Sequence, residues 1–309
     1  MLKTKIKKIL LKAGLLGIIF KLRDSALLAY YVTTGPSYRY LRYSYSCLSF
    51  NMKKKQSQPG TKKQTVSLLC PTRGRPKLAE RLVKSVCRTA MAPERVEVLF
   101  YIDSDDETKD AYMALFKKKE KAFSRLMRCE IIVGEPMSIS KSWNILAEKC
   151  KGDLLAMTND DQVYVDYGWD HALDVEAAKF PDKIFCIWFD DGGFDKAYPC
   201  FPIVSRRWVE ALGYFSLGIF RYGYLDTWIF DIATDIKRLH RIPYVLVEHV
   251  HYGYKKAIID ETHRRRLNAE GDRLRDEKLY EEMSGVREEA AEKLRQVISN
   301  SKQVNKLLL

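Results

Sequence analysis

The sequence lacks paired cysteines, internal repeats and a long apolar run. Its seven cysteines are an odd number without a C-x-x-C pair, which argues against a disulfide framework and gives no zinc-site spacing. The apolar run at residues 9–20 is interrupted by Lys12 and is shorter than the about 20 residues that a membrane-spanning helix needs. With 46% apolar residues, the chain is therefore expected to be globular, with reduced thiols as in a cytosolic protein.

Acidic residues are nearly missing from the N-terminal segment. Residues 1–63 carry fourteen Lys and Arg but a single acid, Asp24, whereas residues 64–309 contain 39 of each sign. A basic segment beside a neutral body indicates attachment rather than a groove for nucleic acid. We expect residues 1–50 to form a basic amphipathic helix that lies peripherally on the cytoplasmic face of a membrane. A cleaved secretory signal and packing on the protein's own body are the alternatives.

Three further boundaries follow from composition. Residues 51–64, "NMKKKQSQPGTKKQ", are polar and contain Pro-Gly, so we expect them to form a linker. The body is expected at residues 65–259, followed by a C-terminal helical extension at 260–309 that is dense in both charge signs. Gly285 is expected to weaken or break this helix.

Short apolar strands alternate with helical spacing in the first half of the body. One strand starts at Val66 and ends at Pro71, a second ends in Asp103, and "DLLAMT" leads into Asn159-Asp160-Asp161. This alternation predicts an α/β fold with a Rossmann-like, mostly parallel sheet flanked by helices. Ligands bind such sheets outside the carboxyl ends of the strands, and two of these ends carry clustered aspartates.

The adjacent Asp160 and Asp161 place two like charges at the end of a predicted buried strand. Two neighbouring carboxylates at a buried strand end repel each other and need solvent, hydrogen-bond donors or a cation. A hard cation such as Mn²⁺ or Mg²⁺, held by few carboxylates, keeps coordination positions for phosphate oxygens. A solvated Asx turn is the alternative explanation.

The order of several segments resembles a known family. "VSLLCPTRGRP", "KGDLLAMTNDD", "VSRRWVEALGYF" and "YLDTWIFDIA", within residues 65–255, are similar to nucleotide-sugar glycosyltransferases of the family 2 type with an A-type (GT-A) fold. The resemblance implies inverting, metal-dependent transfer of a sugar from a nucleotide-sugar donor to a hydroxyl of a glycan or lipid-linked acceptor. It also implies a nucleotide-binding half at 65–165 and an acceptor half at 166–259.

The same resemblance implies the donor and metal residues. Asn159-Asp160-Asp161 departs from a strict Asp-x-Asp element, and its position assigns Asp161 to the metal and Asp160 to the ribose or a metal-bound water. Arg73 could instead neutralise nearby acids, and Asp103 could be a strand-end cap. Asn144 could be a packing or capping residue. The implied donor residues are Pro71, Thr72, Arg73, Asp103, Lys141, Asn144, Asn159 and Asp160.

An inverting transfer also needs a general base, and the acceptor half offers candidates. Asp226 in "YLDTWIFDIA" matches the family position of the base, with a helix N-cap as the alternative role. Asp191 in "WFDDGGFD" is the competitor, together with Asp190. The alternation in "YVLVEHVHYGYKK" places His249 and His251 on one face, and the resemblance implies His251 as a further metal ligand. A hydrogen-bonded structural histidine is the alternative.

Other functions fit parts of the sequence. A sugar-phosphate nucleotidyltransferase would also use such a sheet and a metal, but "PTRGRP" is only a weak version of its Gly-rich phosphate loop. A non-catalytic scaffold is compatible with the incomplete Asp-x-Asp element. A nucleic-acid-binding protein could use the basic arm, but this function leaves the strand-end aspartates without a role.

Overall fold

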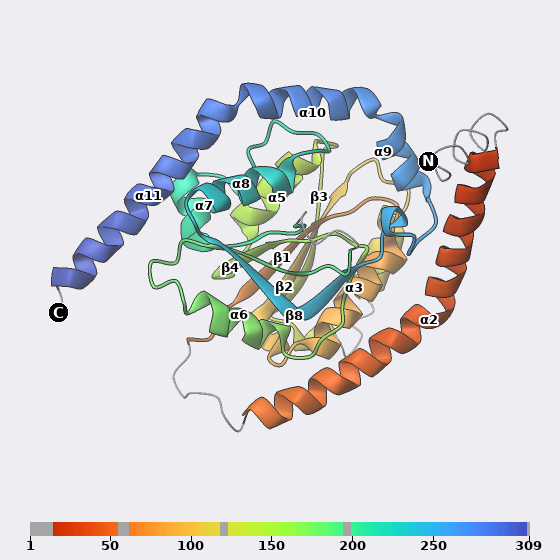
Figure 1. Ribbon diagram of the computed structural model, residues 1–309, viewed down its shortest axis with the longest axis horizontal. Helices are drawn as coiled ribbons and strands as arrows, with labels where there is room; N and C mark the ends of the chain where they lie inside the picture. Colours follow the sequence, from red (N-terminus) through yellow and green to blue (C-terminus); the bar gives the residue numbers. More distant parts are fainter. Residues whose placement is uncertain (1–14, 55–61, 118–122, 194–198, 308–309) are drawn as a thin grey trace, which may run out of the picture.

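The computed structural model describes residues 15–54, 62–117, 123–193 and 199–307. Its centre is an eight-stranded sheet in the order β3-β2-β1-β4-β7-β6-β8-β5, covered by helices on both faces (Figure 1). The strands are β1 Val66–Pro71, β2 Val96–Asp103, β3 Arg128–Gly134, β4 Leu154–Met157, β5 Gln162–Tyr164, β6 Cys186–Asp190, β7 Ile203–Ser205 and β8 Leu239–His249.

Strand directions bring several carboxyl ends to one edge. The ladders β1–β2, β2–β3 and β1–β4 are parallel, so these four strands end on the same side of the sheet. β7 runs antiparallel to both of its neighbours, β6 and β8 are parallel, and β5 is antiparallel to β8. The sheet is thus mixed and mostly parallel, which confirms the α/β fold predicted from the alternation of strands and helices.

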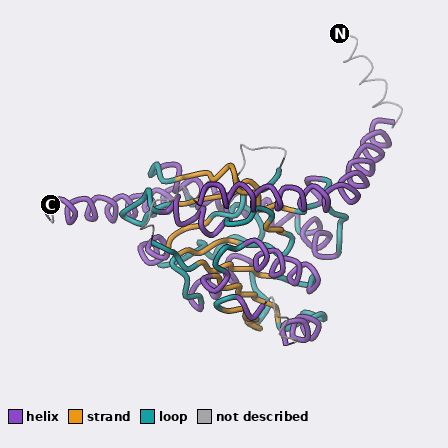
Figure 2. The backbone as a smooth tube through the Cα atoms, turned by 90° about the horizontal axis from the view of Figure 1, so that it is seen from below, coloured by secondary structure: helices purple, strands orange, loops and turns teal. Residues whose placement is uncertain are grey.

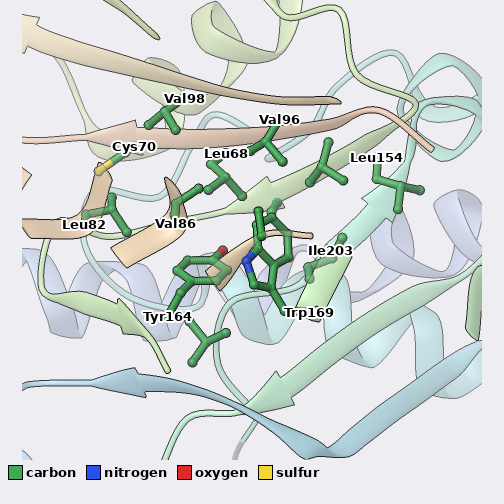
Figure 3. Packing of buried hydrophobic residues seen from close by; sticks show 14 of the residues in the cluster. Leu68, Cys70, Leu82, Val86, Val96, Val98, Leu154, Tyr164, Trp169 and Ile203 are labelled. Carbon is green, nitrogen blue, oxygen red and sulfur yellow. The ribbon is translucent and has the colours of Figure 1, made fainter. Parts of the chain in front are cut away.

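The strands are buried on both faces, as expected for parallel strands rich in Val, Leu and Ile. On one face of the sheet, Leu68 of β1 packs against side chains of α3 and α6. Trp169 and Tyr164 belong to the same cluster (Figure 3). Leu69 points to the opposite face, toward Trp143 of α5. The helices of the body are α3 Pro76–Thr89, α4 Lys109–Lys117, α5 Ile139–Lys149, α6 Trp169–Ala177, α7 Arg206–Leu212 and α8 Leu225–Asp235.

The expected N-terminal helix is present as α2, Leu15–Lys54, which reaches into the segment expected to be a linker. The expected apolar run before residue 15 lies outside the described residues. Arg39 forms an ion pair with Glu248 at 3.1 Å, and Arg42 pairs with Asp166 at 2.7 Å, so α2 packs along the body. Within the described part of the chain, no helix is long and apolar enough to cross a membrane.

Three helices form the C-terminal part: α9 Glu261–Asn268, α10 Glu270–Glu282 and α11 Ser284–Leu307. The break between α10 and α11 falls at Met283, two residues before the predicted weak point, Gly285. Leu294 and neighbouring apolar residues of α11 are buried against the face that carries α7 and α8. Seen from below, the helices next to the two chain ends project from the body in opposite directions (Figure 2).

Candidate metal and nucleotide site

A cavity of about 640 Å³ lies at the shared edge where β1, β2 and β4 end. The loop after β1 contributes one wall, the loop after β4 contributes the Asp160–Asp161 pair, and α9 contributes another wall. Many residues assigned from the resemblance meet here, although they come from segments far apart in sequence. Those that line the cavity are Pro71, Thr72, Arg73, Asp103, Asn159, Asp160, Asp161 and His251.

Three of the chain's five histidines gather around Asp161. Nε2 of His249 lies 3.3 Å from Oδ1 of Asp161, and the ring of His249 stacks on that of His251 with centroids 4.8 Å apart. The rings of His251 and His263 are 4.9 Å apart. Asp161, His251 and His263 each offer one ligand atom, and these atoms all lie within 4.8 Å of one another.

The chemistry of this cluster fits a cation. Nε2 of His263 is buried without a hydrogen-bond partner among the described residues, and Oδ1 of Asp161 is buried with only Nε2 of His249 beside it at 3.3 Å, outside good hydrogen-bond geometry; such atoms are costly unless a ligand or an ion satisfies them. Nδ1 of His263 lies 2.9 Å from Oδ1 of Asp260. The backbone N–H of Asp260 also donates to Nδ1 at 3.3 Å, so the contacts of Nδ1 suit either tautomer, and Nε2 is the ring nitrogen without a partner among the described residues.

The pKa values of the two adjacent aspartates are shifted in opposite directions. Burial raises the pKa of Asp160 to about 6, despite the opposing effect of Arg75. For Asp161 the effect of burial is outweighed by His249 and Arg75, and its pKa is lowered to about 2. Burial and the neighbouring His249 lower the pKa of His251 to about 3, so this imidazole is neutral at neutral pH, as a metal ligand must be.

Arg75, which was not predicted, connects both aspartates to the C-terminal helices. Its Nη1 donates to Oδ1 of Asp160 at 3.1 Å, and it binds Asp260 through two hydrogen bonds of 2.8 Å. Oδ2 of Asp160 accepts a hydrogen bond of 2.6 Å from the hydroxyl oxygen of Thr72. Asp160 is therefore held by groups of the β1 loop, while Asp161 faces the histidines.

The rest of the cavity is rich in Arg. Arg73 donates to Asp103 at 2.7 Å and to Asp105 at 2.5 Å, as the alternative prediction of a neutralising role describes. Arg221, Arg265 and Arg266 also line the cavity. Five Arg and five Asp line the cavity, and guanidinium groups beside a candidate cation site suit a ligand that carries several phosphate oxygens.

Asp191 and Asp226 lie in a neighbouring corner and are not among the residues that line the cavity. Asp191 is buried and accepts the hydroxyl of Tyr254 at 3.1 Å. Burial raises the pKa of Asp226, and its carboxylate accepts the backbone N–H of Thr227 at 2.9 Å. Burial and then the charges of Asp226 and Asp191 raise the pKa of Cys200, so both carboxylates act on this one thiol.

Two predicted donor residues are placed differently. The described lining of the cavity does not include Lys141 or Asn144. The side-chain oxygen of Asn144 accepts the backbone N–H groups of Phe215 and Ser216, and its amide donates to the carbonyl of Ser216 at 2.7 Å. These bonds match the alternative packing role, and they tie α5 to the segment before α8.

Comparisons with known proteins find similarity among solved structures alone. No family model matches the chain, and no curated protein matches it. Among solved structures, it is similar to the mannosyltransferase PcManGT from Pyrobaculum calidifontis in complex with GDP-Man and Mn²⁺, at 14% identity and a TM-score of 0.47, covering 75% of this chain and 70% of that one. It is also similar to residues 1–349 of TarS from S. aureus in complex with UDP, at 12% identity and a TM-score of 0.46, covering 60% of each chain.

Proposed function

We propose that this protein is an A-type glycosyltransferase that moves a sugar from a nucleotide-sugar donor to a hydroxyl of a glycan or lipid-linked acceptor, with inversion. One observation supports the proposal above all. The ligand atoms of the buried Asp161 and His263 and the half-buried His251 converge in an Arg-lined cavity at the carboxyl ends of parallel strands. This arrangement suits a divalent cation together with a diphosphate.

In this proposal Asp161, His251 and His263 hold the cation, and Asp260 orients the ring of His263. When bound, the ion supplies a Lewis acid for the charge that develops on the departing nucleoside diphosphate. Guanidinium groups of the α9 side, Arg265 and Arg266, bind the phosphate oxygens from the solvent side.

The identity of the ligands discriminates between the two candidate ions. Mg²⁺ prefers oxygen ligands in near-ideal octahedral geometry, whereas imidazole nitrogen suits first-row transition metals. Two histidines beside one carboxylate therefore favour Mn²⁺ over Mg²⁺.

The nucleoside is assigned to the wall formed by the loops after β1 and β2. Thr72 and Asp103 line this wall, and Asp103 is held in place by Arg73 at 2.7 Å. The wall lies in the proposed nucleotide-binding half, residues 65–165, and the proposed acceptor half is 166–259. Because His263 and Arg265 come from α9, the start of the extension 260–309 belongs to the donor site in this proposal.

Asp226 is the proposed general base, with Asp191 as the second candidate. Its burial raises the pKa of the carboxyl toward the range in which a carboxylate accepts a proton efficiently at neutral pH. The N-cap position of α8 is occupied by Tyr224, so Asp226 is not the cap of this helix. This leaves its carboxylate for a role beyond helix capping.

Donor hydrolysis, in which water replaces the acceptor, tests the proposal on the full chain. We expect UDP or GDP to be released from one class of nucleotide sugar in the presence of Mn²⁺. The D226N variant should reduce this rate by about a hundredfold, while nucleotide affinity stays unchanged. D235N, at the exposed other end of the same helix, is the matched control. Metal-independent release, or no release from any donor, would contradict the proposal.

Membrane attachment through α2 forms a second part of the proposal. The charges Arg39 and Arg42 face the body, whereas a Tyr- and Leu-rich outer face is open to solvent. Tyrosines suit the interfacial zone of a bilayer, and the basic segment 1–63 complements anionic headgroups on a cytoplasmic face. The exposed fractions on this face reach 65% to 71% for Tyr30, Leu22, Leu41, Tyr45 and Leu48.

Vesicle flotation tests this contact. The L48D variant places a charge on the outer face and should reduce binding to vesicles of mixed neutral and anionic lipids. V286D changes a partly exposed valine of α11 and serves as the control. If L48D and the wild type float equally well, the outer face of α2 is not the membrane contact.

A further inference from the structure

A second cavity, of about 450 Å³, lies between α2 and α3, and one of its lining residues, Arg81, reaches the backbone carbonyl of Asp161 at the candidate donor site. Pro36 and Tyr40 of α2 form one side, and α3 forms the other. Among the described residues, none lines both this cavity and the donor cavity. The second cavity is strongly basic, because its lining contains Arg39, Lys77, Arg81, Lys84 and Arg88.

Four of these cations share one face of α3. Lys77, Arg81, Lys84 and Arg88 follow one another at intervals of four, three and four residues, which places them in a row on the helix. Like charges at such intervals destabilise a helix by a few tenths of a kcal/mol per pair, about 0.2–0.5. Helix stability therefore does not explain why four cations lie in this row. A bound anion would explain it, because it would neutralise their charges.

The protein neutralises this row only in part. Glu80, the one acid in the described lining, accepts from Lys84 at 2.7 Å. Arg39 is paired with Glu248 of β8 at 3.1 Å. Nη2 of Arg81 contacts the carbonyl of Asp161 at 3.4 Å, while its Nε is buried without a hydrogen-bond partner. A buried guanidinium N–H without a partner is costly, so the described residues leave Arg81 incompletely satisfied.

We propose that this cavity binds a phosphate group. Several Lys and Arg side chains that converge on a cavity recognise the oxygens of a phosphomonoester or a diphosphate through charge-assisted hydrogen bonds. The phosphate belongs either to a lipid headgroup or to a soluble metabolite. The proposal is independent of sugar transfer, because it uses none of the residues that line the donor cavity.

Calorimetric titration of inorganic phosphate into the full chain, without divalent metal, tests the site. The K77Q/K84Q variant removes two exposed lysines from the row and should weaken phosphate binding by about tenfold or more, or 1.4 kcal/mol per tenfold. K149Q/K151Q removes two exposed lysines near the start of β4 and keeps the net charge matched, so its affinity should equal that of the wild type. Equal affinity of all three proteins, or no binding to any, would overturn the proposal.

Flotation with vesicles distinguishes the two sources of the phosphate. Vesicles of phosphatidylcholine, with and without phosphatidic acid, are compared for the same three proteins. If the ligand is a headgroup, K77Q/K84Q loses its preference for phosphatidic acid, and free phosphate competes with the vesicles. If the ligand is soluble, K77Q/K84Q binds phosphate weakly but floats like the control.

Discussion

Arg75 and Asp260 face each other across 185 residues of sequence, joined by two hydrogen bonds of 2.8 Å. The same guanidinium donates to Asp160 at 3.1 Å, and Oδ1 of Asp260 lies 2.9 Å from the ring of His263. One arginine thus links the loop after β1, the loop after β4 and the start of α9. The candidate site is assembled from both ends of the body.

Replacing Arg75 by Met should be strongly destabilising. Its side chain is only 10% exposed, and its loss leaves Asp160 and Asp260 without their cation. Breaking a buried pair in this way costs about 3–5 kcal/mol. Urea unfolding would measure this loss, and Mn²⁺ should recover part of it by supplying positive charge beside the aspartates.

The control for this experiment is R295M. Arg295 is 42% exposed and pairs with Asp235 on the surface, where such a pair is worth about 0–1 kcal/mol. Similar losses for the two variants would show that Arg75 does not carry the role assigned to it.

His263 should contribute to metal affinity. The H263A variant removes one of three ligands, and we expect Mn²⁺ binding to weaken by at least about tenfold, as measured by the electron paramagnetic resonance of free Mn²⁺. H171A changes a histidine that packs against Phe50, outside the cluster, and should leave the affinity unchanged. Unaltered Mn²⁺ affinity in H263A would remove His263 from the ligand set.

α11 should behave as part of the core. Leu294 is fully buried against the face of α7 and α8, so L294A should lower the free energy of unfolding by about 2–5 kcal/mol. V286A, on the same helix at 39% exposure, should change it by less than about 0.5 kcal/mol. Equal effects would indicate that α11 is not packed on the body as described.

Docking of α2 should weaken in acid. Burial raises the pKa of Glu248, but Lys256, Tyr31 and Arg39 outweigh this effect and lower it below the ordinary value. Ionised Glu248 therefore stabilises the folded state at neutral pH, and this contribution is lost as the pH falls through the folded pKa, below about 4.3.

Urea unfolding of the wild type and E248Q over the acidic range measures this effect. The stability difference should be largest near neutral pH and should shrink as Glu248 is protonated. A difference that stays constant into the acidic range would exclude Glu248 as the titrating group.

The local patterns predicted much of the fold and part of the site. The apolar strands that end in Pro71 and Asp103, and the one that leads into Asn159-Asp160-Asp161, could be found because strand periodicity and strand-end acids are short-range signals. The parallel sheet then brings these ends together without further information. His251 was placed on the same face as His249, and the stacking of their rings agrees with this prediction.

Contacts between residues far apart in the sequence could not be predicted from local patterns. The boundary expected between residues 259 and 260 cuts through the cluster, because nothing local to Asp260 or His263 signals a contact with Arg75. The capping pattern Asp260–His263 was the available signal, since it places a histidine at the start of a helix after the body. The spacing of the four cations on α3 can be read from the sequence. The cavity that they line forms only because α2 lies beside α3.

The most direct test of the central claim is titration of UDP and GDP into the full chain, with and without Mn²⁺, for the wild type and D161A. If Asp161 and its histidines hold the cation that binds a diphosphate, one nucleotide will bind with Mn²⁺ only, and D161A will abolish this binding. Binding that is indifferent to Mn²⁺ and to D161A would contradict the account, as would no binding of either nucleotide in the presence of Mn²⁺.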